Sequence, residues 1–322
     1  MNKKGIVALV FLSILIFTLS VFIGPRLIVP FKLDETAKEI IISIRLPRII
    51  VSILVGAALG STGAILQGIL RNPLADPYIL GLSSGAALTA ALGLLFNNMF
   101  LGIFTLPAFA FLGAIAAGIA VGTLGQKKGN LLPERLLLAG VGLGFLFSAV
   151  LMLAMILSTD EGLRRATLWL FGDLSMADWP LIPYGLAFIL LGFGLSLWRA
   201  KGLNALMLGD EVAYSLGFSP SKERWILFIA SGLMTAASVS LGGVVGFIGL
   251  LIPHIIRSFV GSDNRVLIPM SALAGGALLC AADTIGRTVA APMELPSGII
   301  TAIIGAPYFL YLLKKKDLLG AS

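Results

Sequence analysis

Side chains able to carry out catalysis or bind a metal are scarce in this sequence. His254 is the single histidine and follows Pro253 in an apolar stretch. It could supply at most one metal ligand, and it is better interpreted as a hydrogen-bonding residue at a helix end. The sequence holds no G-x-x-x-x-G-K-[ST] phosphate-binding loop and no H-E-x-x-H zinc motif. We therefore expect no catalytic residues, no metal site and no ATP hydrolysis in this chain.

Charged residues beside apolar runs are the next candidates. Arg45 and Arg48, in the motif R-L-P-R, begin one apolar run, and Arg287 ends another. These arginines could extend to lipid phosphates, or they could receive carboxylates of a partner protein as bidentate pairs. Asp283 is the main acidic candidate within an apolar run. Because Arg287 lies four residues further on, the spacing favours a structural ion pair over a proton relay.

Two segments between apolar runs have patterns of their own. The segment R-N-P-L-A-D-P contains Asn72, Pro73, Asp76 and Pro77, which predict a rigid break that a helix cannot cross. The segment 203–219 is amphipathic and predicts two short helices separated by a glycine. Such helices could lie in the lipid headgroups or form a docking surface for a cytoplasmic partner. The residues concerned are Leu206, Leu208, Gly209, Asp210, Glu211, Ala213, Leu216 and Gly217.

These residues must be positioned by a scaffold that lipid surrounds. Of the 322 residues 58% are hydrophobic and only 12% are charged, with a mean hydropathy of +1.01. Soluble domains carry about 25% charged residues. A water-soluble chain of this length could not bury so much apolar surface, so lipid must be part of its solvent. The sequence predicts an all-α, polytopic membrane protein with a single transmembrane domain over residues 1–322.

About ten apolar runs are expected to cross the bilayer. The distribution of lysine and arginine orients them, because the inner segments hold 15 of the 23 basic residues when the N-terminus is placed inside. We therefore expect both ends in the cytoplasm, the three arginines outside, and segment 203–219 inside, between spans six and seven. The run 246–260 is short and is expected to be a broken or partial helix. The expected spans are 5–24, 46–69, 79–96, 103–125, 133–157, 180–198, 225–243, 246–260, 267–289 and 296–313.

Smaller features agree with this interpretation. The net charge of +7 lies in loops without interleaved aromatics, which favours membrane orientation over nucleic-acid binding. The first run lacks a small-x-small cleavage site and is expected to remain as a span rather than to act as a signal peptide. Gly56, Gly60 and Gly63 share one helix face and predict a close approach of two helices. Cys280 is the single cysteine, which excludes an intrachain disulfide.

Several segments, in order, resemble the permease subunits of ABC importers for iron complexes and cobalamin. Each would be weak evidence alone, but the ordered set is specific, and it runs from about residue 40 to the end. The first span matches only in character. The matching segments are R-L-P-R; L-V-G-A-A-L-G-S-T-G-A-I-L-Q (Leu54 to Gln67); R-N-P-L-A-D-P-Y-I-L-G-L-S-S-G-A-A (Arg71 to Ala87); L-G-D-E-V-A-Y-S-L-G; V-G-F-I-G-L-L-I-P-H-I-I-R (Val245 to Arg257); A-D-T-I-G-R; and E-L-P-S-G-I-I-T-A-I-I-G-A-P-Y-F-L-Y-L-L (Glu294 to Leu313).

The resemblance implies a ten-helix subunit of the cell (inner) membrane that forms a homodimer, with the substrate path between the two copies. Two separate ATP-binding subunits, which would carry ATP and Mg, would dock below, and an extracytoplasmic substrate-binding protein above. It assigns Arg45, Arg48 and Arg287 to docking of the binding protein, and the Leu206 to Gly217 segment to helices that press on the ATPase.

The implied function is import of a metal chelate. Ferric siderophores, haem and cobalamin are substrates of this family, as are molybdate-type oxyanions in some members, and the motifs do not separate them. The alternative is an ion- or proton-coupled secondary transporter, which would need no partner chain. The shortage of acidic residues within the spans argues against that alternative.

Overall fold

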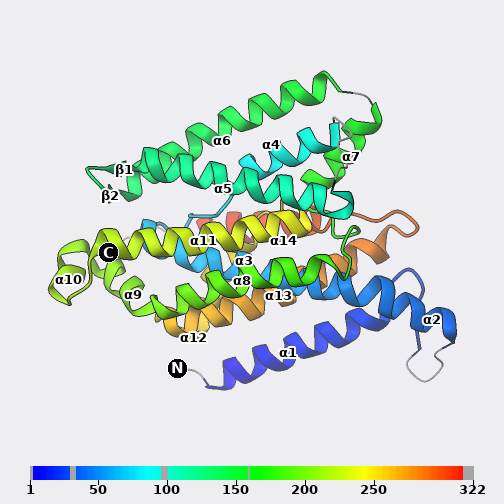
Figure 1. Ribbon diagram of the computed structural model, residues 1–322. Helices are drawn as coiled ribbons and strands as arrows, with labels where there is room; N and C mark the ends of the chain where they lie inside the picture. The colour runs from blue at the N-terminus through cyan, green and yellow to red at the C-terminus, as the bar shows by residue number, and fades with distance from the viewer. Residues whose placement is uncertain (1–2, 30–33, 96–100, 159, 315–322) are drawn as a thin grey trace.

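The computed structural model describes residues 3–29, 34–95, 101–158 and 160–314, and it is a bundle of roughly aligned helices (Figure 1). The long elements are α1 (Lys3–Phe22), α3 (Leu46–Leu70), α4 (Leu82–Leu95), α5 (Thr105–Gly125), α6 (Pro133–Ile156), α8 (Leu181–Trp198), α11 (Pro220–Gly242), α12 (Ile248–Val260), α13 (Asn264–Val289) and α14 (Ser297–Lys314).

Short elements lie at the two ends of the bundle (Figure 1). At one end are α2 (Glu35–Glu39), the π-helix η1 (Ile40–Arg45), the 3₁₀ turn η2 (Gly102–Phe104) and α7 (Asp160–Leu170). At the other are α9 (Ala200–Leu208), α10 (Asp210–Ser215) and a hairpin of strands β1 (Gln126–Lys127) and β2 (Asn130–Leu131). Helices α9 and α10 were predicted from the sequence, whereas α2, α7 and the hairpin were not. Strands β1 and β2 and helix α2 are too short to show periodicity, and α7 is a short amphipathic helix between two apolar runs.

The expected all-α, polytopic architecture is confirmed, and each predicted apolar run contains one long element. Among the described residues, seven helices are long and apolar enough to cross a bilayer, whereas α4, α12 and α14 are shorter. The irregularity expected at 246–260 is present. Phe247 adopts a left-handed backbone conformation with φ of 70°, so α12 begins only at Ile248. By contrast, α11 begins five residues earlier than expected, at Pro220, a residue suited to the first helical turn.

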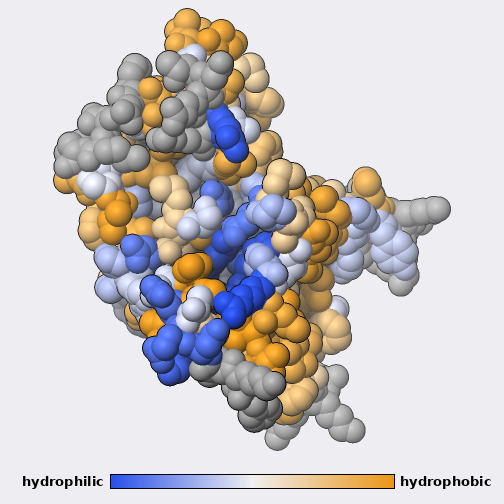
Figure 2. Space-filling view, turned by 90° about the vertical axis from the view of Figure 1, so that its right-hand side faces the viewer, coloured by the Kyte–Doolittle hydropathy of each residue, from blue (hydrophilic) through white to orange (hydrophobic). Residues whose placement is uncertain are grey.

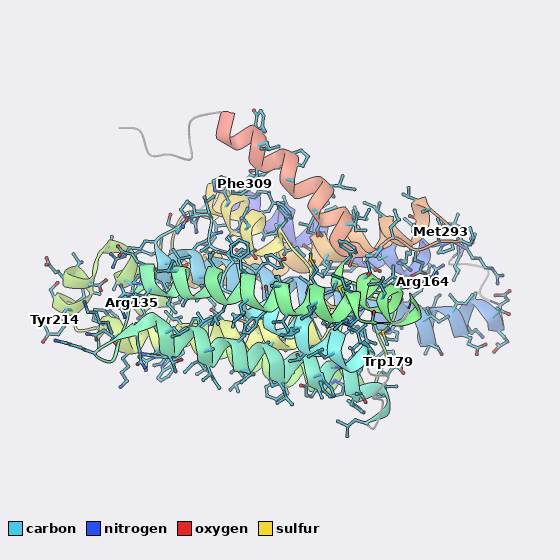
Figure 3. All side chains as sticks on the ribbon, turned by 90° about the horizontal axis from the view of Figure 1, so that it is seen from above. Arg135, Arg164, Trp179, Tyr214, Met293 and Phe309 are labelled. Atoms are coloured by element: carbon cyan, nitrogen blue, oxygen red, sulfur yellow. The ribbon has the colours of Figure 1, made fainter. Side chains whose placement is uncertain are left out.

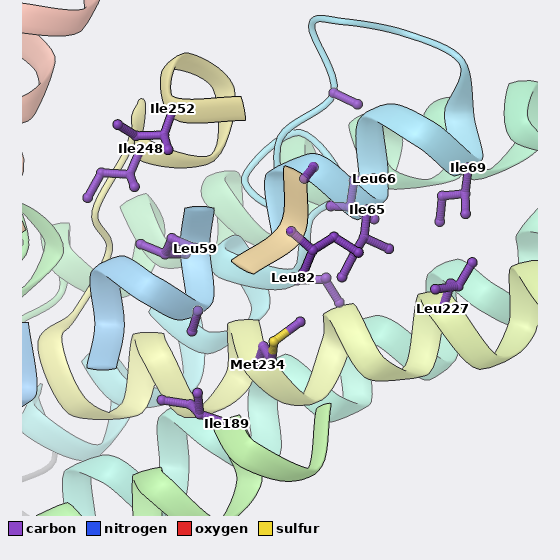
Figure 4. Packing of buried hydrophobic residues seen from close by; sticks show 14 of the residues in the cluster. Leu59, Ile65, Leu66, Ile69, Leu82, Ile189, Leu227, Met234, Ile248 and Ile252 are labelled. Atoms are coloured by element: carbon purple, nitrogen blue, oxygen red, sulfur yellow. The ribbon is translucent and has the colours of Figure 1, made fainter. Parts of the chain in front are cut away.

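Helix α3 is the axis of the bundle. It packs against α8, α11, α12 and α13, and its core residues Ile65 and Leu66 are fully buried. Figure 4 shows these two residues in the same cluster as Met234 of α11 and Ile248 of α12. Burial on every side distinguishes α3 from an amphipathic surface helix and explains its nearly continuous apolar sequence.

Glycines allow α3 to approach its neighbours closely. A Cβ added at Gly56 or Gly60 would collide with backbone carbonyls of α13, and one added at Gly63 would collide with the carbonyl of Gly249 in α12. These contacts confirm the expected role of the glycine face. In lipid, helices associate largely through such close van der Waals packing.

The flanks of the bundle are apolar. Only 11% of the apolar window of α1, and the same share of α6, is buried within the chain, and Phe11 and Phe145 are largely exposed. Seen from the end that carries α2 and α7, hydrophilic residues gather in the middle of the face and hydrophobic ones around much of its rim (Figure 2). Such flanks require lipid or another apolar protein surface as their neighbour.

Candidate functional site

Charged side chains meet at the end of the bundle where α3 begins. The Nε of Arg48 donates to both carboxylate oxygens of Asp283 in α13 at 3.0 Å, and its Nη2 donates to Asp283 Oδ1 at 2.9 Å. Its Nη1 donates to Glu294 Oε2 at 2.6 Å. Arg48 and Asp283 are both buried, whereas the Glu294 side chain is 42% exposed. Buried charges are tolerated when they are paired and hydrogen-bonded, as here.

The pairing of Asp283 differs from the local expectation. Arg287 does lie four residues further along α13, with its Nε 3.7 Å from Asp283 Oδ2. The main partner of Asp283 is nevertheless Arg48, which is 235 residues away in the sequence. Spacing within one helix could not reveal this partner, because it depends on how α3 packs against α13.

Arg45 and Arg287 secure the end of α1. Nη1 of Arg45 donates to the carbonyl of Val21 at 2.7 Å, and Nη2 of Arg287 donates to the carbonyl of Ser20. Both carbonyls belong to the last turn of α1, where backbone oxygens have no partner within the helix and the helix dipole favours cations. The two arginines therefore cap α1 from the end of η1 and from α13.

Burial changes the interpretation of these arginines. From their position in the sequence, Arg45, Arg48 and Arg287 were expected to present their charges to the outside, yet they are 3%, 7% and 3% exposed. In this conformation all three guanidinium groups donate to acceptors of the same chain, although the Nε of Arg287 has no hydrogen-bond partner among the described residues. A docking role for them therefore stays a prediction, and it requires a partner carboxylate to compete with the chain's own acceptors.

The opposite end of the bundle carries α9 and α10. Gly209 separates the two helices with φ of 124°, a conformation that favours glycine, as the sequence pattern predicted. Arg71, itself left-handed with φ of 48° at the end of α3, donates from Nε to the carbonyl of Leu206 at 2.8 Å. Asn204 of α9 donates to Asp263 Oδ1 at 2.8 Å, which fastens α9 to the turn before α13.

Asp210 links this helix pair to two spanning helices. Its carboxylate accepts from Arg71, and Nη1 of Arg224 donates to Asp210 Oδ2 at 2.8 Å. The hydrogen bonds from Arg224, together with the charges of Arg224 and Arg71, hold the pKa of Asp210 below its ordinary value. The carboxylate consequently stays charged at neutral pH and bridges α10 to α3 and α11.

The residues of the 203–219 segment divide into two groups. Leu206 and Ala213 are fully buried and fix the helices to the bundle. The large apolar side chains that project furthest outward include those of Leu208, Tyr214 and Leu216, which are 68%, 76% and 58% exposed. Tyr214 lies at the extreme end of the molecule (Figure 3). The polar or flexible members Glu211 and Gly217 are exposed as well.

The connection 71–81 forms the break that its prolines and Asx residues predicted. The Oδ1 of Asn72 accepts from the backbone N–H of Leu74 at 2.9 Å, and Oδ1 of Asp76 accepts from that of Tyr78 at 2.8 Å. These two turns replace helical hydrogen bonds, and α4 begins only at Leu82, three residues later than the expected span. Asp76 is 7% exposed despite its position in a connection.

A cavity of about 500 Å³ opens beside this connection, a size typical of small-molecule sites. Sequence reasoning missed it, because its walls come from four separate parts of the chain. Phe247, which precedes α12 and lines the cavity, packs against Gly305 of α14. The lining includes Asp76, Tyr78, Phe171, Val244, Phe247 and Ala302.

Fold and sites together define a polytopic α-helical membrane protein with a buried charge cluster at one end, a tethered helix pair at the other, and a cavity between helices. The family model described as the FecCD transport family matches residues 6–315. The chain belongs to this family.

Curated relatives and a solved structure agree with that membership. The chain is 43% identical to the cobalamin import system permease protein BtuC of Halobacterium salinarum over 89% of this chain and 76% of that protein. It is 41% identical to the hemin transport system permease protein HmuU of Yersinia pestis, covering 88% and 85%. It is 38% identical to the iron(3+)-hydroxamate import system permease protein FhuG of Bacillus subtilis, covering 98% of each chain. A metal-chelate-type ABC transporter in an inward-facing conformation has the same fold, with a TM-score of 0.89 and 32% identity over 97% of this chain and 99% of that one.

Proposed function

We propose that this chain is the membrane-spanning permease subunit of an ATP-driven importer for a metal chelate: a ferric siderophore, haem or cobalamin. The observation that carries the proposal is the family match over residues 6–315, supported by curated relatives that import these compounds. The chain itself makes no covalent chemistry. ATP and Mg bind to a separate ATPase subunit.

The proposed topology has ten crossings, with the start of α1 and the end of α14 in the cytoplasm. Two observations support it. The short helices α4, α12 and α14 are apolar, and non-helical backbone at membrane depth is tolerated where protein covers it. In addition, α1 begins and α14 ends toward the end that carries α9 and α10 (Figures 1 and 3).

The proposed assembly has two copies of this chain, two ATPase subunits and an extracytoplasmic binding protein. The exposed apolar residues Leu208, Tyr214 and Leu216 would contact the ATPase, and Asp210 would hold them in place. The three buried arginines would serve the binding protein at the opposite end. The cavity beside Asp76 would contribute to the chelate path, which runs between the two copies.

Transport would proceed by alternating access. Nucleotide binding would close the two ATPases and displace α9 and α10. These helices are tied to α3, α11 and the turn before α13, so their displacement would move rigid helices around the dimer axis. The energy would come from differential contacts in the two nucleotide states.

The deciding experiment is uptake of candidate chelates into proteoliposomes that contain the chain with its ATPase and binding protein. We expect uptake only with ATP on the ATPase side and binding protein on the other. Uptake driven by a pH gradient or membrane potential without ATP would instead establish the alternative, a secondary transporter. A panel of a hydroxamate siderophore, haem and cobalamin would identify the substrate.

A further inference from the structure

An apolar groove runs between α5 and α11 on the outside of the bundle. It encloses about 250 Å³, and its walls expose almost no polar surface. It extends from Thr123 and Trp225 at one end to Ala114 and Leu233 at the other. At 1.5 Å per residue this is about 12–14 Å, close to half of the roughly 30 Å hydrocarbon core of a bilayer. Gly232 leaves open space on its wall, since an added Cβ there would meet nothing within 4 Å.

Basic residues lie on the elements that adjoin one end of the groove. The hairpin that follows α5 exposes Lys127 and Lys128, and the Oγ of Ser221 donates to the Gly129 carbonyl at 3.1 Å, which fastens the hairpin to the first turn of α11. Lys222 is exposed three residues before Trp225, so it lies on the same helix face as this wall of the groove. Along the chain next to the hairpin, Arg135 adds a positive charge and Glu134 a negative one.

We infer that this groove binds one acyl chain of an anionic phospholipid from the cytoplasmic leaflet, whose phosphate is held by Lys127, Lys128 and Lys222. The groove is apolar, has the length of one leaflet and opens at its charged mouth at the membrane surface. Trp225 stands at that mouth, where aromatic belts of membrane proteins lie. Juxtamembrane lysines attract the anionic lipids of this leaflet. The inference rests on the proposed orientation of the chain, but not on its substrate.

Charge complementarity selects the lipid over a protein occupant. A second copy of this chain, or the ATPase, could also cover an apolar groove. The open space at Gly232, where an added Cβ would meet nothing within 4 Å, shows that the groove is not filled by the chain's own side chains. A flexible chain with an anionic head satisfies both the apolar walls and the lysines at the mouth.

The test is native mass spectrometry of the detergent-solubilised complex of this chain with its ATPase, titrated with phosphatidylglycerol or phosphatidylcholine of identical acyl chains. Gly232→Leu fills the groove, and Gly194→Leu on α8 is its control, because that exposed glycine also has open space around it. The triple variant Lys127→Gln, Lys128→Gln and Lys222→Gln removes the proposed phosphate site. Lys201→Gln, at the same end of the bundle, is the control for charge.

We expect the wild-type complex to retain phosphatidylglycerol more tightly than phosphatidylcholine. Gly232→Leu should reduce retention of both lipids to background, and the triple variant should lose its preference for phosphatidylglycerol, by about fivefold for each lysine. Both controls should behave as wild type. If Gly232→Leu does not fold, the double variant Ile119→Ala with Ile229→Ala, which shortens two side chains of the groove walls, should give the same loss of lipid retention.

Unchanged retention in Gly232→Leu, or an equal loss in Gly194→Leu, would overturn the inference. Loss of the ATPase or of the second copy from the Gly232→Leu complex would show that protein occupies the groove. Failure of chelate uptake would leave this result untouched, because lipid retention is measured without transport.

Discussion

At the scale of single residues, the buried pair of Arg48 and Asp283 determines how α3 and α13 fit together. Its three hydrogen bonds span two helices that also touch through their glycines. A pair of this kind offsets its own desolvation only while both partners remain. Its value therefore lies in fixing the register of the two helices rather than in net stability.

The first prediction concerns this pair. Asp283→Asn should destabilise the protein by about 3–5 kcal/mol, because Arg48 loses its buried carboxylate partner and keeps only the partly exposed Glu294. The double variant Arg48→Met with Asp283→Leu should recover most of this loss. Denaturation of the purified protein in detergent measures both, and Glu35→Gln at an exposed pair serves as the control. If the double variant is as unstable as the single one, the unpaired charge of Arg48 is not the cause of the lower stability.

The second prediction uses Glu294, the exposed partner of Arg48. If Arg48 receives a carboxylate of the binding protein, Glu294 competes for the same Nη1. Glu294→Gln should then strengthen binding of the binding protein several-fold, since a neutral amide is a weaker acceptor for a guanidinium. Surface plasmon resonance on nanodiscs measures the affinity. Weaker binding would mean that Glu294 itself, rather than Arg48, contacts the partner.

At the scale of elements, α9 and α10 combine a fixed inner face with an exposed outer one. Arg71, Asp210 and Arg224 connect them to α3 and α11 at positions far apart in the sequence. A force on the outer face would therefore reach two spanning helices directly.

The third prediction distinguishes residues that fix α10 to the bundle from residues that contact the ATPase. Asp210→Asn removes the charge that bridges Arg71 and Arg224, so transport should fall while the ATPase still co-purifies and hydrolyses ATP. Leu216→Glu should instead reduce co-purification, with Ser219→Glu as the control.

Because the folded pKa of Asp210 is lowered, the stability that its charge contributes is present above the ordinary pKa and is lost only as pH falls below it. The wild type should therefore show no loss of coupling between pH 6 and 8. A drop in coupling within that range would contradict this role.

The fourth prediction concerns the glycine face of α3. Gly63→Ala places a Cβ against the Gly249 carbonyl and should destabilise the protein by about 1–3 kcal/mol through overpacking. Gly194→Ala, in open space on α8, should lie within about 0.5 kcal/mol of wild type. Thermal unfolding in detergent compares the two. Equal melting temperatures would show that α3 and α12 can separate without cost.

At the scale of the whole molecule, the two ends differ in chemistry while the flanks are apolar. At one end Arg48 and Asp283 form a buried ion pair, whereas at the other end a helix pair, itself tied down by the ion pair of Asp210 with Arg224, projects exposed apolar side chains. This difference between the two ends suits a protein with different partners on the two sides of a membrane.

The fifth prediction tests the orientation. Cysteines placed at Tyr214 and at Met293, which are 76% and 71% exposed and lie at opposite ends (Figure 3), should react with impermeant maleimide from opposite sides of the membrane. Tyr214→Cys should be labelled only from the cytoplasm and Met293→Cys only from outside. The native Cys280 is buried and should stay unlabelled. Labelling of both from one side would disprove the ten-crossing topology.

The sequence by itself determined the all-α membrane class, the long helices and the breaks between them. Each depends on residues close together in the chain. These are the apolar runs that are long enough to lie in lipid, the prolines and Asx turns at 72–77, and Gly209 between two short helices. It also indicated which glycines would face a neighbour, although not which neighbour.

Only the tertiary structure decided which charges meet and where space remains. Arg48 reaches Asp283 across 235 residues, Arg45 and Arg287 bond to the end of α1, and the cavity beside Asp76 is lined by four distant segments. Helix packing brings these atoms together, and no local spacing encodes it. For the same reason the arginines that appeared free to meet a partner proved to be buried against acceptors of their own chain.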